Sequence, residues 1–135
     1  MAIQLSVAVR NARLDVIEST IGASAILRIR TGAAPANCGT ADSGTVLATL
    51  TLPSDWMSAA SGGVKSLLGT WQDAAADATG TAAHYRIYDS SGTTCHLQGS
   101  VTVTGGGGDI TVDNVSFATG QQFTITSFSL TDANA

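Results

Sequence analysis

The 135-residue chain is poor in charge, since only 12% of its residues are charged and it has a single lysine and a single glutamate. Soluble domains usually carry about twice that fraction. The net charge of −4 offers no basic patch, so we expect neither nucleic acid nor an anionic membrane as a partner. Small residues take the place of charges. Such a surface is typical of a protein packed against copies or partners, or simply of a small-residue β protein.

Long apolar runs are also missing, because no stretch approaches the ~18 residues of a membrane span. The N-terminal residues lack the basic start of a signal peptide, and Arg10, Arg13 and Asp15 interrupt their apolar stretch. We therefore expect the chain to fold in a cytoplasm, with Cys38 and Cys95 as thiols. Their spacing fits no zinc-binding pattern, and a later disulfide stays open as an alternative.

One stretch, residues 6–21, has the pattern of an amphipathic helix. Ser6 is a suitable cap for its start and Gly22 for its end. Apolar residues recur at spacings of three and four. They are Leu5, Val9, Ala12, Leu14, Val16, Ile17 and Ile21. A helix this short needs a surface to dock on, either the chain's own sheet or a neighbouring molecule.

Most of the remaining chain alternates apolar and polar residues with the period of two that indicates strands. The predicted strands and hairpins are 25–30, 45–52, 64–71, 83–99, 101–112 and 122–130. We expect a single all-β domain over residues 1–135, an antiparallel β-sandwich or small barrel with the short N-terminal α-helix. The predicted core is Leu27, Ile29, Val46, Leu50, Tyr85, Ile87, Cys95, Leu97, Val101, Val103, Ile110, Val112, Phe123 and Ile125.

Two segments between the predicted strands differ from the alternating pattern. The loop 31–44 is long for a compact domain, which is typical of a contact loop but also of a surface excursion without a role. Pro35 and Asn37 lie in this loop and are candidate contact residues. The segment 53–63 is predicted to form a single helical turn, with Ser54 as its cap.

The hairpin 83–99 holds both histidines of the chain and is the most crowded candidate for an active site. A three-residue turn at 90–92 separates apolar from polar residues and places Arg86 opposite His96. His84, Arg86 and His96 are then expected together on the outward face, exposed or against a neighbouring subunit. Two imidazoles on neighbouring strands are able to share a metal ion, but no third ligand is evident. We therefore expect a polar hairpin face without a metal.

Other arrangements that would support catalysis are also lacking. Cys95 is expected on the face opposite both histidines, which leaves it without an activating base. No serine has the Gly-x-Ser-x-Gly context of a hydrolase nucleophile. The four glycines at 105–108 are predicted to form a hairpin tip, because no Lys-Ser/Thr pair and no helix follow them as in a phosphate loop. We expect no enzymatic activity and no cofactor.

Several segments together resemble a class of phage proteins. They are SVAVRNARLDVIESTIG at 6–22, ILRIRTGAAPANC at 26–38, TVLATLTLPSDWM at 45–57, GTAAHYRIYDSSGTTCHLQGSV at 80–101 and TGGGGDITVDN at 104–114. Over nearly all of its length the chain resembles small virion proteins that are encoded among the head and tail genes of tailed bacteriophages and prophages.

The resemblance implies a structural role, and within that class a capsid decoration (cement) protein on the outside of the phage head. Such proteins fold in the host cytoplasm and then bind the assembled shell, often as trimers. The implied partners are the major capsid protein and other copies of the chain, and the implied location is the virion. The candidate contact residues are Trp56, Trp71, His84, Arg86, His96, Pro35 and Asn37.

Two other functions remain open. A tail or fibre component that recognises a host-surface glycan would use Trp56 and Trp71 as stacking platforms, together with the loop 31–44 and the glycine tip. Exposed tryptophans would favour this function and buried ones would count against it, since tryptophans are more often core or interface residues. The third function, a metal-dependent hydrolase, would need His84 and His96 to bind the metal.

Overall fold

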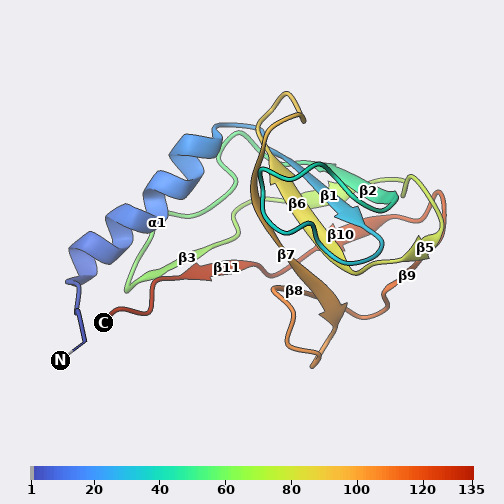
Figure 1. Cartoon of the computed structure of the whole chain (residues 1–135). Helices are drawn as coiled ribbons and strands as arrows, with labels where there is room; N and C mark the ends of the chain where they lie inside the picture. The colour runs from blue at the N-terminus through green and yellow to red at the C-terminus, as the bar shows by residue number, and fades with distance from the viewer. Residues whose placement is uncertain (1) are drawn as a thin grey trace.

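A curled sheet of five strands forms the centre of the structure, a computed structural model that describes residues 2–135. In spatial order the strands are β2 (Val46–Thr51), β1 (Ile26–Arg30), β6 (His84–Tyr88), β7 (Cys95–Val103) and β8 (Ile110–Val112). Neighbouring strands are antiparallel, except that β8 runs parallel to β7. The sheet is therefore mixed, and it curls like half of a barrel (Figure 1).

Three antiparallel ladders complete the β-structure, and each pairs a middle segment of the chain with a more C-terminal one. They are β3 (Val64–Ser66) with β11 (Ser129–Thr131), β4 (Trp71–Asp73) with β10 (Phe123–Ile125), and β5 (Gly80–Thr81) with β9 (Ser116–Phe117). The prediction of a mostly-β chain with one N-terminal helix is confirmed.

The predicted hairpin across the four glycines is wrong, because β8 runs parallel to β7 and not antiparallel to it. Val101 lies opposite Ile110 in this pair. Alternation of apolar residues reads the same for either strand direction, so the pattern did not distinguish the two pairings. The glycines make the tight return feasible. The Gly108 N–H donates to the Thr102 hydroxyl at 3.0 Å, and a Cβ on Gly108 would lie 2.8 Å from that same oxygen.

The helix α1 (Val7–Ile21) has the predicted bounds. At its start the Ser6 hydroxyl accepts the Val9 N–H at 3.3 Å, and Gly22 ends it with a φ of +93°. The helix packs beside β3 (Figure 1). The local signals of capping and spacing therefore defined this element correctly.

The inward face of α1 is bound to the backbone of the segment 53–63. Glu18 accepts two N–H groups of this segment, while Asp15 and Asn11 accept one each, all at 2.9–3.1 Å. These side chains accept backbone N–H groups of the segment 53–63. In a helical turn, the same N–H groups would bond to water or to carbonyls of the turn itself. The helical turn predicted with Ser54 as its cap is therefore wrong, and the segment is irregular.

Lys65 on β3 fixes this contact from below the helix and is only 2% exposed. Its Nζ lies 2.8 Å from Asp15 Oδ1 and 2.9 Å from Glu18 Oε2, and it donates to the Ser58 carbonyl at 3.0 Å. Burial on its own lowers the pKa of Lys65, but the two carboxylates outweigh burial and raise it. The ammonium therefore stays charged, and we call Asp15, Glu18 and Lys65 the lysine clamp.

Most of the predicted core lies inside the molecule. The buried members are Leu27, Ile29, Leu50, Tyr85, Ile87, Val101, Ile110, Phe123 and Ile125. Cys95, Leu97 and Val112 are half-buried, and Val103 is 45% exposed. Val46 is also only half-buried, because a bulge pairs it with Arg30 and turns Leu47 into the core in its place.

The lysine clamp predicts a large loss of stability on substitution of Lys65→Ala. We expect the free energy of unfolding to fall by about 2–4 kcal/mol, because the half-buried carboxylate of Glu18 loses its cation and the buried Lys65 side chain leaves a void. Denaturant unfolding followed by tryptophan fluorescence measures this loss. Asp55→Ala is the control, since Asp55 is an exposed charge of the segment that α1 binds, and its loss should cost less than about 0.5 kcal/mol. Equal losses for the two variants would contradict the clamp.

Candidate functional site

The hairpin of β6 and β7 has a register two residues away from the predicted one. Arg86 lies opposite Gln98 and not opposite His96. The Asp89 N–H donates to the Thr94 carbonyl at 3.1 Å, so the turn holds four residues. His96 is an extra residue in a bulge of β7, and this bulge restores the separation of faces that an even turn would lose. The predicted register is wrong because it assumed that only an odd turn keeps the faces apart.

The polar face of β6, predicted to be outward, is buried under the chain's own loop. His84 and Arg86 are each 1% exposed. The loop 31–44 lies over them and supplies their hydrogen-bond partners. The prediction that His84 and Arg86 lie on an outward face, exposed or against a neighbouring subunit, is therefore wrong. The long loop is a contact loop, but its contacts are internal.

Arg86 holds the loop 31–44 in place. Its guanidinium donates to three loop carbonyl oxygens at 3.0–3.2 Å, those of Asn37, Cys38 and Thr40. It also donates to Gln98 Oε1 at 3.1 Å, and Gln98 Nε2 in turn donates to the Pro35 carbonyl at 2.7 Å. The backbone carbonyls of the candidate contact residues Pro35 and Asn37 therefore hold the loop 31–44 on β6 and β7. The Asn37 residue as a whole is exposed.

Asp42 is the carboxylate of this network. It forms ion pairs with Arg86 and, at 2.9 Å, with Arg30, and it accepts the Tyr88 hydroxyl at 2.8 Å. Burial on its own raises the pKa of Asp42, but the hydrogen bonds from Tyr88 and Arg86 and the charges of the two arginines outweigh burial. The pKa of Asp42 therefore lies below its ordinary value. We call Arg30, Asp42, Arg86 and Tyr88 the arginine network.

The structure does not bring the two histidines into one site. His84 Nδ1 donates to the Gly32 carbonyl at 2.7 Å, and its buried Nε2 has no hydrogen-bond partner among residues 2–135. His96 is exposed at the β7 bulge, where it lines a small pocket with Ile17 and Ile21 of the helix. Within residues 2–135 no group of three His, Cys, Asp or Glu side chains is placed to hold a metal ion.

Trp56 and Trp71 lie in the core, both with 0% exposure. They form part of a chain of aromatic contacts, with ring centroids 5.9 Å apart, that continues from Trp71 to Phe128 and Tyr85. All seven aromatic side chains of the protein are in fact buried. The described residues therefore offer no exposed ring on which a sugar would stack.

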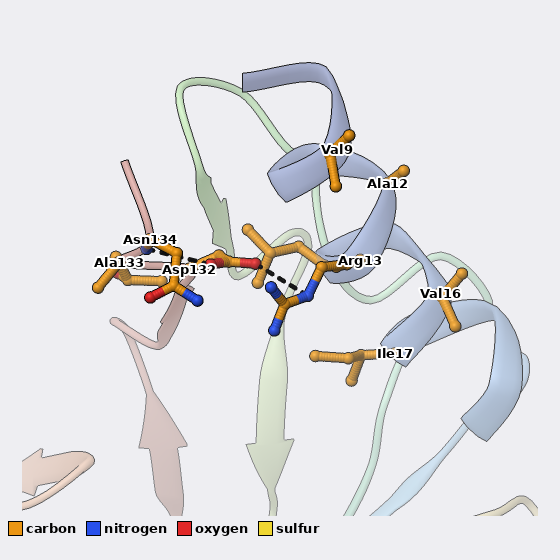
Figure 2. Close-up of a pocket in the computed structure, with 10 residues that line it drawn as sticks. Val9, Ala12, Arg13, Val16, Ile17, Asp132, Ala133 and Asn134 are labelled. Carbon is orange, nitrogen blue, oxygen red and sulfur yellow. Dashed lines mark hydrogen bonds and ion pairs between the residues drawn. The ribbon is translucent and has the colours of Figure 1, made fainter. Parts of the chain in front are cut away.

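An open groove lies on the surface between α1 and the C-terminal residues 131–134. It has a volume of about 790 Å³. Its helix side is lined by Val9, Ala12, Arg13, Leu14, Val16 and Ile17, and its other side by residues 131–134. Figure 2 shows Arg13 crossing the groove towards Asp132, which it meets at 3.2 Å. We call this hollow the α1 groove.

The outer edge of the α1 groove is an exposed apolar stripe. Val9 is 46% exposed and Val16 is 58% exposed, with the small Ala12 between them. Figure 2 shows the three side chains along the same side of the helix. Ile3 and Val7, at the N-terminal end of the helix, are exposed as well. The sequence did predict this stripe, but it left open whether the stripe covers the sheet or a neighbour.

Comparisons of the chain with models of protein families, with curated proteins and with solved structures give no match. No helix among residues 2–135 has the length and apolar character needed to cross a membrane. The function is therefore inferred from this chain's own residues, and above all from the α1 groove and the apolar stripe beside it.

The arginine network predicts a specific dependence of stability on pH. Because its pKa is lower in the folded state, Asp42 contributes stability that is present at neutral pH and is lost as the pH falls below about 4. We expect Asp42→Asn to unfold more easily than the wild type at pH 7, and the difference to shrink towards pH 2. Denaturant unfolding across this range measures it. Asp113→Asn, at an exposed position, is the control and should follow the wild type throughout. A difference that stays constant down to pH 2 would contradict the role of the Asp42 charge.

Proposed function

We propose that the protein is a structural component of a tailed-bacteriophage virion, and that it is a capsid decoration (cement) protein on the outside of the head. The observation that carries this proposal is the orientation of α1. Asn11, Asp15 and Glu18 accept backbone N–H groups of the domain, beside the buried Leu14 and Ile21, whereas Val9 and Val16 are about half exposed and touch no such group. A surface helix of a protein without partners normally keeps its valines on the buried side and its carboxylates in water.

The lysine clamp prevents the helix from turning its apolar stripe inward. Rotation of α1 about its axis would separate Asp15 and Glu18 from Lys65 and would leave a buried ammonium without a counter-charge. It would also remove the acceptors of the segment 53–63. The stripe is therefore presented permanently to the outside, as a docking surface requires.

The proposed partner is the assembled shell, through an apolar surface of the major capsid protein. Ala12 at the middle of the stripe allows close approach, and the flanking Val9 and Val16 supply apolar area to bury. Two features of the composition fit a lattice contact, namely the low charge and the many small side chains. Copies of the chain are proposed to associate as trimers on the shell, and the curled sheet to be an open form of a small barrel.

The alternative functions have less support. A tail or fibre module that recognises glycans would need exposed aromatic platforms, but Trp56 and Trp71 are buried with the other aromatic residues. A metal-dependent hydrolase would need His84 and His96 together, but one lies under the loop 31–44 and the other lies at an exposed bulge. Neither function is supported by a specific contact among the described residues.

Co-sedimentation with empty capsid shells of the same phage tests the proposal. We expect the purified protein to sediment with shells at close to one copy per capsid subunit. Val16→Asp should weaken this binding more than about tenfold, because it places a charge in an apolar contact. Val103→Asp is the matched control, since Val103 is also exposed but lies at the far end of β7 from His96 and the helix. A wild-type protein that ignores shells, or equal losses for both variants, would contradict the proposal.

A further inference from the structure

Cys38 and Cys95 are distant in sequence but line the same small pocket. The pocket has a volume of about 370 Å³ and is also lined by Arg86 and parts of two turns, at 39–42 and 93–94. Cys38 belongs to the loop 31–44, and Cys95 is the first residue of β7. Both are free thiols in the structure, and both are half-buried. The loop and the hairpin therefore meet at this pocket, and each contributes one cysteine to its lining.

The backbone on both sides of the pocket is held by hydrogen bonds. On the loop side, Arg86 donates to the Cys38 carbonyl at 3.2 Å and to the carbonyls of Asn37 and Thr40. On the hairpin side, Cys95 pairs with Tyr88 in the sheet, and its Sγ donates to the Leu97 carbonyl at 3.5 Å. The two cysteines are therefore positioned by the fold and do not meet by chance motion of a free loop.

The environment of Cys95 also reflects the nearness of Cys38. Burial and then the neighbouring Cys38 thiol raise the pKa of Cys95 to about 11, although the charge of Arg86 and the hydrogen bond to Leu97 act in the opposite direction. At neutral pH Cys95 is therefore held as a thiol and is a poor first nucleophile.

We propose that Cys38 and Cys95 form an intramolecular disulfide when the folded protein meets an oxidising low-molecular-weight disulfide such as oxidised glutathione. The bond joins the loop 31–44 covalently to the start of β7. This inference goes beyond the proposed function and does not depend on it, because it needs no capsid partner. It concerns the protein after it has left a reducing cytoplasm.

The reaction proceeds by two thiol–disulfide exchanges. The Cys38 thiolate attacks one sulfur of oxidised glutathione, the glutathione disulfide bond breaks, and one glutathione thiolate leaves. Cys95 then loses its proton to solvent, attacks the Cys38 sulfur of the mixed disulfide and releases the second glutathione thiolate. Two cysteine sulfurs are oxidised, and one oxidised glutathione is reduced to two glutathione molecules, which take up the two protons.

The disulfide holds the loop 31–44 in place over the arginine network. The loop 31–44 carries Asp42 and the carbonyl acceptors of Arg86, and hydrogen bonds and ion pairs hold it on β6. A covalent bond between Cys38 and Cys95 keeps these acceptors beside Arg86 during thermal fluctuations. It also restricts the unfolded chain, which loses conformational entropy through the closed loop.

Incubation of the purified full chain with oxidised glutathione tests the proposal. We expect the intact mass to fall by two hydrogen atoms, with a Cys38–Cys95 linked peptide after digestion, and dithiothreitol should reverse the change. The melting temperature should rise by about 5–15 °C. Cys38→Ser and Cys95→Ser are the matched controls, since neither variant can form the link, and their melting temperatures should not rise on oxidation.

Three results would overturn the proposal. The first is glutathione adducts on the wild-type protein that never resolve into the internal link, and the second is disulfides between molecules. The third is a link that forms but leaves the melting temperature unchanged, which would contradict the locking of the loop. The assay contains no shells, so its failure is distinguishable from a failure of the proposed capsid binding.

Discussion

The ion cluster of Lys65 with Asp15 and Glu18 is the interaction on which the rest of the structure depends. It fixes the rotation of α1 about its own axis, and with it which residues of the helix face solvent. Glu18 also holds the backbone of Trp56, whose indole donates to the Gly22 carbonyl at 3.0 Å and packs on Trp71. The same contact therefore orients the helix and places the centre of the aromatic core.

The few charges of this chain are used mainly inside it. Of its six lysine and arginine side chains, the four buried ones are Arg10, Arg30, Lys65 and Arg86. Lys65 ties the helix to β3, and Arg86 ties the loop 31–44 to β6, each through carboxylates and backbone carbonyls. The outer surface is left with even fewer cations than the composition suggests, and the exposed valines of α1 lie on this weakly charged surface.

Local signals predicted the parts of the fold that depend on neighbouring residues, such as the bounds of α1 and much of the core. They failed where one extra residue or the strand direction decides the outcome. The bulges at Leu47 and His96 change which face of the sheet the following side chains occupy, without a visible change in the alternating pattern. The same pattern fits either direction of β8. The sequence pattern predicted that His84 and Arg86 are exposed, because both are polar. They are buried because their hydrogen-bond partners lie in the distant loop 31–44. The sequence predicted the apolar stripe that borders the α1 groove. That the stripe faces outward follows from the lysine clamp, which the sequence did not predict.

The three ladders that join middle strands to C-terminal ones also set the order in which the chain can fold. β3, β4 and β5 have no partner until β11, β10 and β9 have been synthesised, and the Leu5 N–H near the start of the chain bonds to Asn134 O at 2.7 Å. Contacts this far apart in sequence make folding slow, because the cost of closing long loops precedes the gain from pairing. On a translating ribosome the native state is therefore reached only after residues 129–134 have left the exit tunnel, and a chain truncated before them would expose unpaired strands prone to aggregation.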